Sequence, residues 1–386
     1  MSGFIRKIIR KHLSQESRSF LRTAYGILRH PSRTGKLLNR YKYDSTVAKS
    51  SVIDYTPPVF AVTITDTCNL RCPTCLYLLE DEDKFTPSFI KVDEFKTILE
   101  AFNKRKFAEV IFLTGGEPLL HPDLSELIDT CREYDLAVKT STNGILLPKV
   151  EEVLPKFDYV NVSLDAFDEA SFKEYRGGTP AQFARIKEGV GILNDKGVNF
   201  SVSFLLSNDN ISQLDKMLAF AEVIQPKFVY LHNINPHGCE GFESLSFQDE
   251  RVVKELKGLL STREHSFDIH VAHVFDKDST AFTNGVCVQP WYYFCFNSCG
   301  DVAYCCHLAH DNSIGNVLEE YDNNSPPMRS FRDAMMKAKY PVSCRYCQRR
   351  FLNDDFAHFH KATKQWTLLQ DKPFKTAMER FTLSLQ

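Results

Sequence analysis

Residues 60–75 read Phe-Ala-Val-Thr-Ile-Thr-Asp-Thr-Cys-Asn-Leu-Arg-Cys-Pro-Thr-Cys. The apolar and β-branched run Phe60–Thr65 is typical of a strand buried on both faces. A loop follows with C-x3-C-x2-C spacing at Cys68, Cys72 and Cys75. Three thiolates on one loop can hold three irons of a [4Fe-4S] cluster and leave the fourth iron open to another ligand. A structural zinc site needs four ligands, and no fourth Cys or His lies close by in the sequence.

The same strand pattern recurs along the next 170 or so residues, separated by helical patterns. The expected strands are Phe60–Thr65, Glu109–Thr114, Ala137–Ser141, Tyr159–Ser163, Asn199–Leu206 and Phe228–Asn233. The expected helices are Val92–Lys104, Leu124–Tyr134, Val150–Phe157, Ala181–Lys196 and Ile211–Ile224. This alternation predicts an α/β fold with a parallel sheet, open or curled into a partial (β/α)6 barrel. Ligands of such sheets bind at the carboxyl ends of the strands.

Polar motifs stand at those strand ends. The run Thr114–Pro118 contains Gly115, Gly116 and Glu117, where glycines allow close backbone approach and a carboxylate can accept from an ammonium group. Asn143 and Ser163 follow the third and fourth strands and suit ribose hydroxyls, and Arg176 could pair with a carboxylate. Each motif alone also fits a turn or a cap. Their order along successive strand ends favours one shared site.

Together these residues resemble the radical S-adenosylmethionine (SAM) superfamily from about Phe60 to Asn233. The resemblance implies that the three cysteines bind a [4Fe-4S] cluster whose open iron is chelated by SAM. It implies a 5'-deoxyadenosyl radical that removes hydrogen from a substrate carbon, and a reductant such as flavodoxin or ferredoxin. It also implies SAM contacts: Gly115, Gly116 and Glu117 to the ammonium, Asn143 and Ser163 to the ribose region, and Arg176 to the carboxylate.

Seven of the twelve cysteines lie between Cys287 and Cys347. Four of these cysteines lie around a strand-rich hairpin and have C-x17-C-x38-C-x2-C spacing: Cys287, Cys305, Cys344 and Cys347. Four such ligands can close a metal site. The pattern resembles the Twitch subgroup, a shortened SPASM domain of α+β type, and implies one auxiliary [4Fe-4S] cluster and two clusters in all. A zinc ribbon using the same cysteines, with His307 or His310 replacing one, is the alternative.

The first 50 residues carry a net charge of +10, and the remainder carries −12. Residues 4–13 and 20–28 place apolar side chains at helical spacing opposite cations. Two interpretations stay open: a peripheral membrane contact through residues 1–31, or docking on the acidic remainder of the chain. No nucleic-acid motif accompanies the charge, so no nucleic acid partner is expected.

The chain lacks an apolar run of spanning length and a secretory signal pattern, so a cytoplasmic protein is expected, with the peripheral membrane contact left open. The predicted organisation is a basic amphipathic segment, a radical SAM core, a connecting segment, an auxiliary cluster domain and a helical tail, at residues 1–55, 56–240, 241–285, 286–350 and 351–386.

The favoured function is a two-electron, dehydrogenase-type oxidation of a small-molecule, glycan or peptide substrate, assisted by the auxiliary cluster. Epimerisation and bond formation on a peptide are the enzymatic alternatives. A zinc-binding scaffold protein is the alternative of another class. The catalytic acid and base are not identified by the sequence.

Overall fold

A computed structural model describes residues 15–29, 31–75, 88–234, 242–245, 249–262, 264–271, 287–305, 313–319, 321–339, 341, 344 and 357–368. The core is a parallel sheet whose strands follow the predicted pattern. Its strands are β1 (Val59–Thr65), β2 (Val110–Gly115), β3 (Ala137–Thr142), β4 (Tyr159–Ser163), β5 (Phe200–Leu206), β6 (Phe228–Asn233) and β7 (Asp268–Val271). Each pairs in parallel with the next, which confirms the predicted α/β class. The unpredicted β7 extends the sheet beyond β6.

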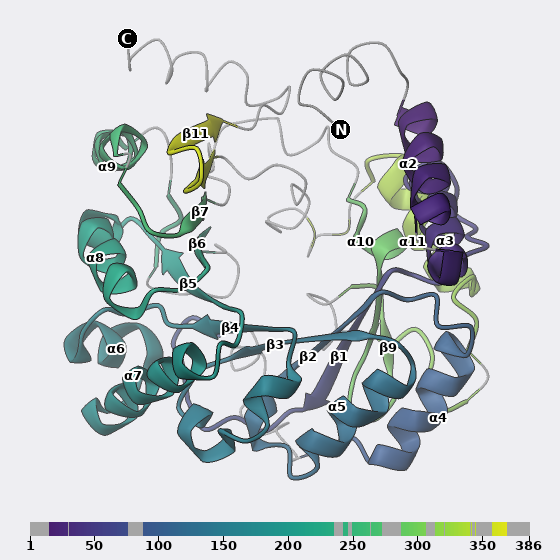
Figure 1. Ribbon diagram of the computed structural model, residues 1–386, viewed down its shortest axis with the longest axis horizontal. Helices are drawn as coiled ribbons and strands as arrows, with labels where there is room; N and C mark the ends of the chain where they lie inside the picture. The colour runs from purple at the N-terminus through teal and green to yellow at the C-terminus, as the bar shows by residue number, and fades with distance from the viewer. Residues whose placement is uncertain are drawn as a thin grey trace.

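The sheet curves, and helices cover its outer side (Figure 1). These helices are α4 (Val92–Asn103), α5 (Leu124–Glu133), α6 (Glu169–Arg176), α7 (Pro180–Asp195) and α8 (Leu214–Ile224), with α9 (Glu250–Ser261) beyond β7. On β4, Val160 and Val162 are fully buried in the main apolar core. Their neighbours Asn161 and Ser163 are only partly buried, as alternation along a strand requires. The opposite face of the sheet therefore presents polar side chains.

One predicted helix is wrong. Residues 150–157 lie across two 3-10 turns, η4 (Leu147–Val150) and η5 (Leu154–Lys156), each with a proline in its first turn. Pro155 lies within the predicted range and lacks a backbone donor, so a continuous helix over residues 150–157 would lose a hydrogen bond. The structure instead contains α6, which the sequence analysis missed. Asp168 and Ser171 form a capping box at its start, and Gly177 ends it with a left-handed φ of 64°.

The C-terminal part joins the same sheet on both edges. Strand β8 (Tyr293–Phe296) pairs in parallel with β1, and β9 (Val302–Ala303) returns antiparallel to it. Helix α10 (Gln289–Tyr292) precedes β8, and α11 (Pro326–Met336) follows the hairpin. The predicted helical tail at 351–386 is wrong in its described residues. They form an antiparallel hairpin on β7, β10 (Ala357–His360) and β11 (Gln365–Leu368), because alternating side chains flank a tight turn at 361–364.

Two helices precede the sheet: α2 (Gln15–Arg29) and α3 (Thr34–Thr46), joined by the 3-10 turn η1 (Pro31–Arg33). Both lie beside α10 and α11 in Figure 1. The second predicted amphipathic stretch, residues 20–28, lies in α2, and the first, residues 4–13, lies outside the described residues. Within the described part of the chain, no helix has the length and apolar character needed to span a bilayer.

Candidate functional site

The three-cysteine loop begins directly after β1 and is held by backbone contacts. Cys75 N donates to Cys72 O at 3.1 Å. Arg71 Nη1 donates to the carbonyl oxygens of Cys68 and Leu70, each at 3.0 Å. These contacts hold the short loop that carries all three cysteines at the carboxyl end of the sheet.

All three cysteines are partly buried. Burial raises the pKa of the Cys68 thiol and raises the pKa of Cys72 to about 11. The Cys68 and Cys72 thiols are therefore protonated at neutral pH until iron binds, and cluster assembly must release those two protons. Among the described residues, no three His, Cys, Asp or Glu side chains are grouped to hold a single metal ion. In a [4Fe-4S] cluster, by contrast, each cysteine binds its own iron.

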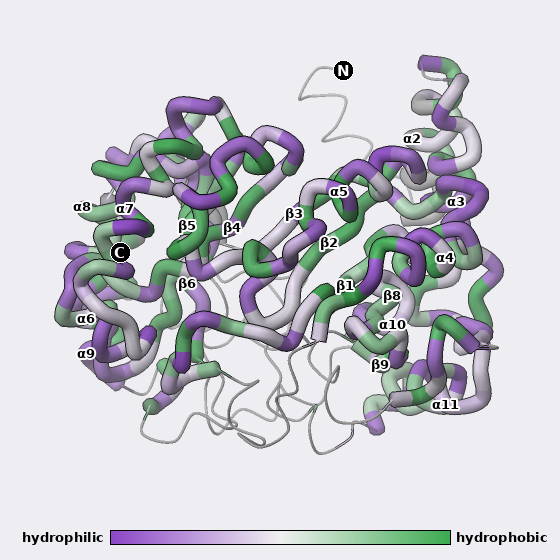
Figure 2. Tube along the Cα trace, turned by 90° about the horizontal axis from the view of Figure 1, so that it is seen from below, coloured by the Kyte–Doolittle hydropathy of each residue, from purple (hydrophilic) through white to green (hydrophobic). Residues whose placement is uncertain are grey.

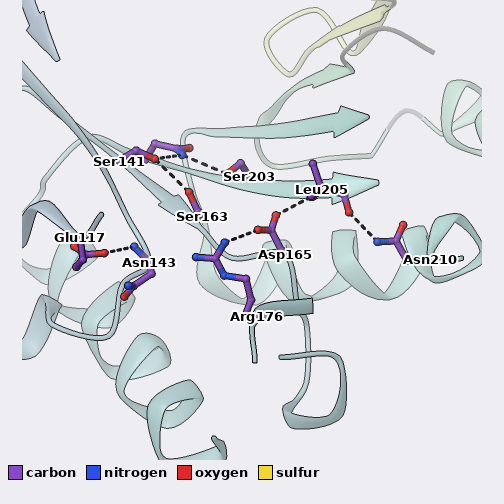
Figure 3. Close-up of polar contacts among 10 residues, drawn as sticks. Glu117, Ser141, Asn143, Ser163, Asp165, Arg176, Ser203, Leu205 and Asn210 are labelled. Carbon is purple, nitrogen blue, oxygen red and sulfur yellow. Dashed lines mark hydrogen bonds and ion pairs between the residues drawn. The ribbon is translucent and has the colours of Figure 1, made fainter. Parts of the chain in front are cut away.

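Arg176, at the end of α6, lies buried beside these cysteines. Its Nη1 donates to Asp165 Oδ2 at 2.8 Å, and Asp165 Oδ1 accepts from the backbone of Leu205 at 2.7 Å (Figure 3). Burial acts to lower the Arg176 pKa, but the Asp165 carboxylate and Cys72 in its thiolate form raise it overall. The Nε of Arg176 is buried and has no hydrogen-bond partner within the described structure. An unfilled cationic donor beside three thiols fits an anionic group such as a cluster or a carboxylate.

The Gly-Gly-Glu-Pro loop after β2 packs directly on the cysteine loop. A Cβ at Gly115 would lie 2.1 Å from Thr65 O, and a Cβ at Gly116 would lie 2.3 Å from Thr67 O. Gly116 N also donates to Thr65 O at 2.9 Å, and Glu117 N to Thr67 O at 2.8 Å. Both glycines are therefore required where this loop meets the end of β1.

Glu117 is 1% exposed, and its carboxylate is surrounded by protein donors. It accepts from Thr142 Oγ1 at 2.7 Å, from Asn143 N at 2.7 Å and from Leu119 N at 3.1 Å. Burial raises the Glu117 pKa, and these three donors oppose the shift. The carboxylate thus joins the ends of β2 and β3. Its predicted contact with the SAM ammonium stays a prediction.

Asn143 and Ser163 lie where the sequence predicted, at the ends of β3 and β4. Asn143 Nδ2 donates to Asn69 Oδ1 on the cysteine loop at 2.7 Å. Ser163 Oγ lies 3.2 Å from Ser141 Oγ, within a polar network that continues through Asn161 to Ser203 (Figure 3). The structure therefore brings all the predicted core residues to one end of the sheet. Their individual contacts with SAM stay predictions.

Two residues of this site were not predicted, Asn69 and Asp66. Asp66 directly follows β1, and its carboxylate accepts from Ser88 and, at 3.1 Å, from Ser298 in the turn between β8 and β9. The carboxylate thereby connects the cysteine loop to the C-terminal hairpin. No sequence signal could pair residues 66 and 298, because they lie 232 positions apart.

Three of the four predicted auxiliary cysteines gather in a second apolar cluster. Cys305 and Cys344 are buried there with Trp291 and Met335, and Cys287 packs against the cluster from its edge. The fourth, Cys347, lies outside the described residues, as do His307 and His310. Cysteines from three separate segments of the chain thus contact one apolar cluster.

The Radical SAM superfamily model matches residues 62–221. A probable GTP 3',8-cyclase of Methanococcus vannielii is 30% identical over 240 residues, which cover 58% of this chain and 77% of that protein. The chain belongs to the radical SAM superfamily. Membership implies a [4Fe-4S] cluster and SAM, which when bound supply the electron and the radical for hydrogen abstraction. The cysteine loop and the unfilled Arg176 donor of this radical SAM enzyme fit that pair of groups.

Other relatives differ in name and coverage. The PqqA peptide cyclase of Gluconobacter oxydans is 26% identical over 301 residues, covering 74% of this chain and 81% of that protein. The crystal structure of Streptococcus suis SuiB bound to S-adenosylmethionine matches with a TM-score of 0.60 at 16% identity, over 90% of this radical SAM chain and 83% of SuiB. A probable GTP 3',8-cyclase of Sulfurisphaera tokodaii is 31% identical over 55% of this chain, and this chain spans 66% of that protein. The chain spans 55% and 44% of two further relatives.

Proposed function

We propose that this radical SAM enzyme carries out a two-electron oxidation of a substrate carbon, of the alcohol-to-carbonyl type. Overall, SAM and the substrate alcohol give methionine, 5'-deoxyadenosine, the carbonyl product and a proton. The electron that starts the reaction comes from a reductant such as flavodoxin or ferredoxin and is regained when the substrate radical is oxidised. The substrate is a small molecule, a glycan or a peptide.

The observation that supports this proposal is that Cys305 and Cys344 lie in one buried apolar cluster, against which Cys287 packs. A Twitch-type auxiliary [4Fe-4S] cluster at this place would accept the electron from the oxidised substrate. The hairpin β8–β9 supports the arrangement, since β8 pairs with β1 and Ser298 contacts Asp66. The proposed auxiliary unit would thus adjoin the strand that leads into the cysteine loop.

The core residues of this proposed site bind SAM and orient it. We propose that Arg176 Nε donates to the SAM carboxylate, with Asp165 fixing the guanidinium plane. Asn143 and Ser163 take the ribose region, and backbone groups of Gly115 and Gly116 lie beside the ammonium. The buried carboxylate of Glu117 keeps the ends of β2 and β3 in register for these contacts.

Iron analysis after anaerobic reconstitution tests the two cluster sites. The wild-type chain should hold about eight irons, four for each [4Fe-4S] cluster. The Cys68→Ala/Cys72→Ala/Cys75→Ala variant should lose about half of the iron and all release of 5'-deoxyadenosine under reduction. The Cys287→Ala/Cys305→Ala/Cys344→Ala variant should also lose about half, yet still release 5'-deoxyadenosine without forming oxidised product.

The exposed Cys299 gives a matched control, because Cys299→Ser should keep the full iron content. Unchanged iron in the second triple variant would refute the auxiliary cluster. Zinc in place of iron at both sites, with no 5'-deoxyadenosine, would favour the zinc-binding scaffold protein.

A second candidate is radical modification of a peptide, by bond formation or epimerisation. The similarity to the PqqA peptide cyclase favours it, since the match covers 81% of that protein. Deuterium transfer separates the two candidates: 5'-deoxyadenosine should acquire deuterium from a deuterated polyol in the first case and from a deuterated peptide in the second. Loss of two hydrogens from the peptide then indicates bond formation, exchange of one deuterium for hydrogen indicates epimerisation, and an unchanged isotope pattern indicates no reaction.

A further inference from the structure

Helix α2 has an apolar face that nothing in the described structure covers. Leu21, Tyr25 and Leu28 are 48%, 57% and 81% exposed. They recur at intervals of four and three residues, so they lie along one side of the helix over two turns. Scattered exposed apolar side chains are ordinary, but a continuous stripe of this kind marks an interaction surface.

The other side of α2 packs on α3. Thr23 is buried, and the ring of Phe20 lies 6.2 Å from that of Tyr41 in an edge-to-face contact. Figure 2 shows α2 extending past α3 at one corner of the molecule. The helix therefore docks on α3, which belongs to the same basic segment, and it does so without burying its apolar stripe.

Two exposed cations lie at the end of α2 and in the following turn η1. The Arg29 guanidinium lies 5.3 Å from the centre of the Tyr25 ring, and both Arg29 and Arg33 are exposed. They belong to the segment whose net charge is +10, whereas the rest of the chain carries −12. A partner that binds this stripe must therefore contact apolar side chains and positive charges together.

We propose that α2 docks on an anionic lipid bilayer, with Leu21, Tyr25 and Leu28 in the acyl boundary and Arg29 and Arg33 at the lipid phosphates. Such helices lie in the interface plane, and their binding grows with apolar area and with attraction to anionic lipids. A second copy is a poorer occupant, because two stripes face to face would bring like charges together. The acidic remainder of the chain would be repelled from the same bilayer and stay in the water.

Sedimentation of the full chain with vesicles tests this docking. The protein should bind vesicles of mixed phosphatidylcholine and phosphatidylglycerol and should bind vesicles of phosphatidylcholine alone at least about tenfold more weakly. Leu21→Ser/Leu28→Ser should lower binding about tenfold, and Val223→Ser, at a comparably exposed position on α8, should leave it unchanged. Arg29→Glu/Arg33→Glu should weaken binding, whereas Lys104→Glu/Arg105→Glu should not. High salt should reduce wild-type binding.

Circular dichroism and 5'-deoxyadenosine release, both unchanged in the α2 variants, show that the variants are folded. Failure of the wild-type chain to sediment with anionic vesicles would overturn the proposal. So would light scattering that shows a dimer dispersed by Leu21→Ser/Leu28→Ser in the absence of lipid, since a second copy would then be the occupant. These outcomes are independent of the reaction proposed above.

Discussion

Arg176 and Asp165 form an ion pair of 2.8 Å whose side chains are only 11% and 10% exposed. A buried charge that loses its partner is costly, because neither water nor another group replaces the partner. We therefore expect Asp165→Asn to lower the free energy of unfolding by about 3–5 kcal/mol and to weaken SAM binding. Urea denaturation of the apoprotein and equilibrium SAM binding measure the two effects.

The control for this pair is Asp129→Asn, which breaks the exposed contact of Asp129 with Lys156 at 2.6 Å. Exposed pairs contribute about 1 kcal/mol or less. Equal effects of Asp165→Asn and Asp129→Asn would show that the buried pair has no special role in the site.

Gly116→Ala should disturb the cysteine loop. The added Cβ would meet the backbone oxygen of Thr67 at 2.3 Å, so the loop must move. We expect a destabilisation of about 1–3 kcal/mol and a reduced iron content after reconstitution. Gly191→Ala, on α7 with open space around it, should leave iron content unchanged and raise stability by up to about 1 kcal/mol. Normal iron binding by Gly116→Ala would contradict the packing argument.

Ser298→Ala should loosen the connection between the C-terminal hairpin and the cluster loop. It removes the hydrogen bond to the Asp66 carboxylate and the contact with Ser88 Oγ at 2.6 Å, a loss of about 1–2 kcal/mol. Iron should therefore pass to an added chelator faster than in the wild type. Ser313→Ala, which removes a contact with the backbone of Gly315, serves as control. If both variants release iron at the wild-type rate, the contact does not hold the loop.

Tyr321 should make stability sensitive to alkaline pH. Burial raises its pKa from the ordinary 10.0 to about 12. The folded state thus holds the phenol proton more tightly than the unfolded state. The resulting contribution to the free energy of unfolding is complete below pH 10 and is lost as the pH rises towards about 12. Tyr321→Phe keeps the ring contacts with Phe294 and Phe102. Its unfolding free energy should fall less steeply over this range in a pH series of urea titrations; parallel curves would refute the assignment.

Much of the core could be predicted from local sequence. The six strands were found because each is a short apolar run bounded by turn residues, and the cysteine loop because its spacing is compact. Helix α6 was missed because its identity depends on the Asp168 cap rather than on a long apolar stripe. Contacts such as Asn143 with Asn69 and Ser298 with Asp66 were missed because they join distant segments, and spacing carries no information about them.

The pairing of β8 with β1 has a further consequence. Without residues 287–305, strand β1, which leads into the cysteine loop, would become an edge strand of the sheet. Its apolar stretch would then have unpaired backbone donors and acceptors on one side. Such edge strands recruit strands from other molecules. A chain truncated before β8 should therefore aggregate and not remain a soluble, active enzyme. By covering β1, the C-terminal unit prevents strand pairing between molecules.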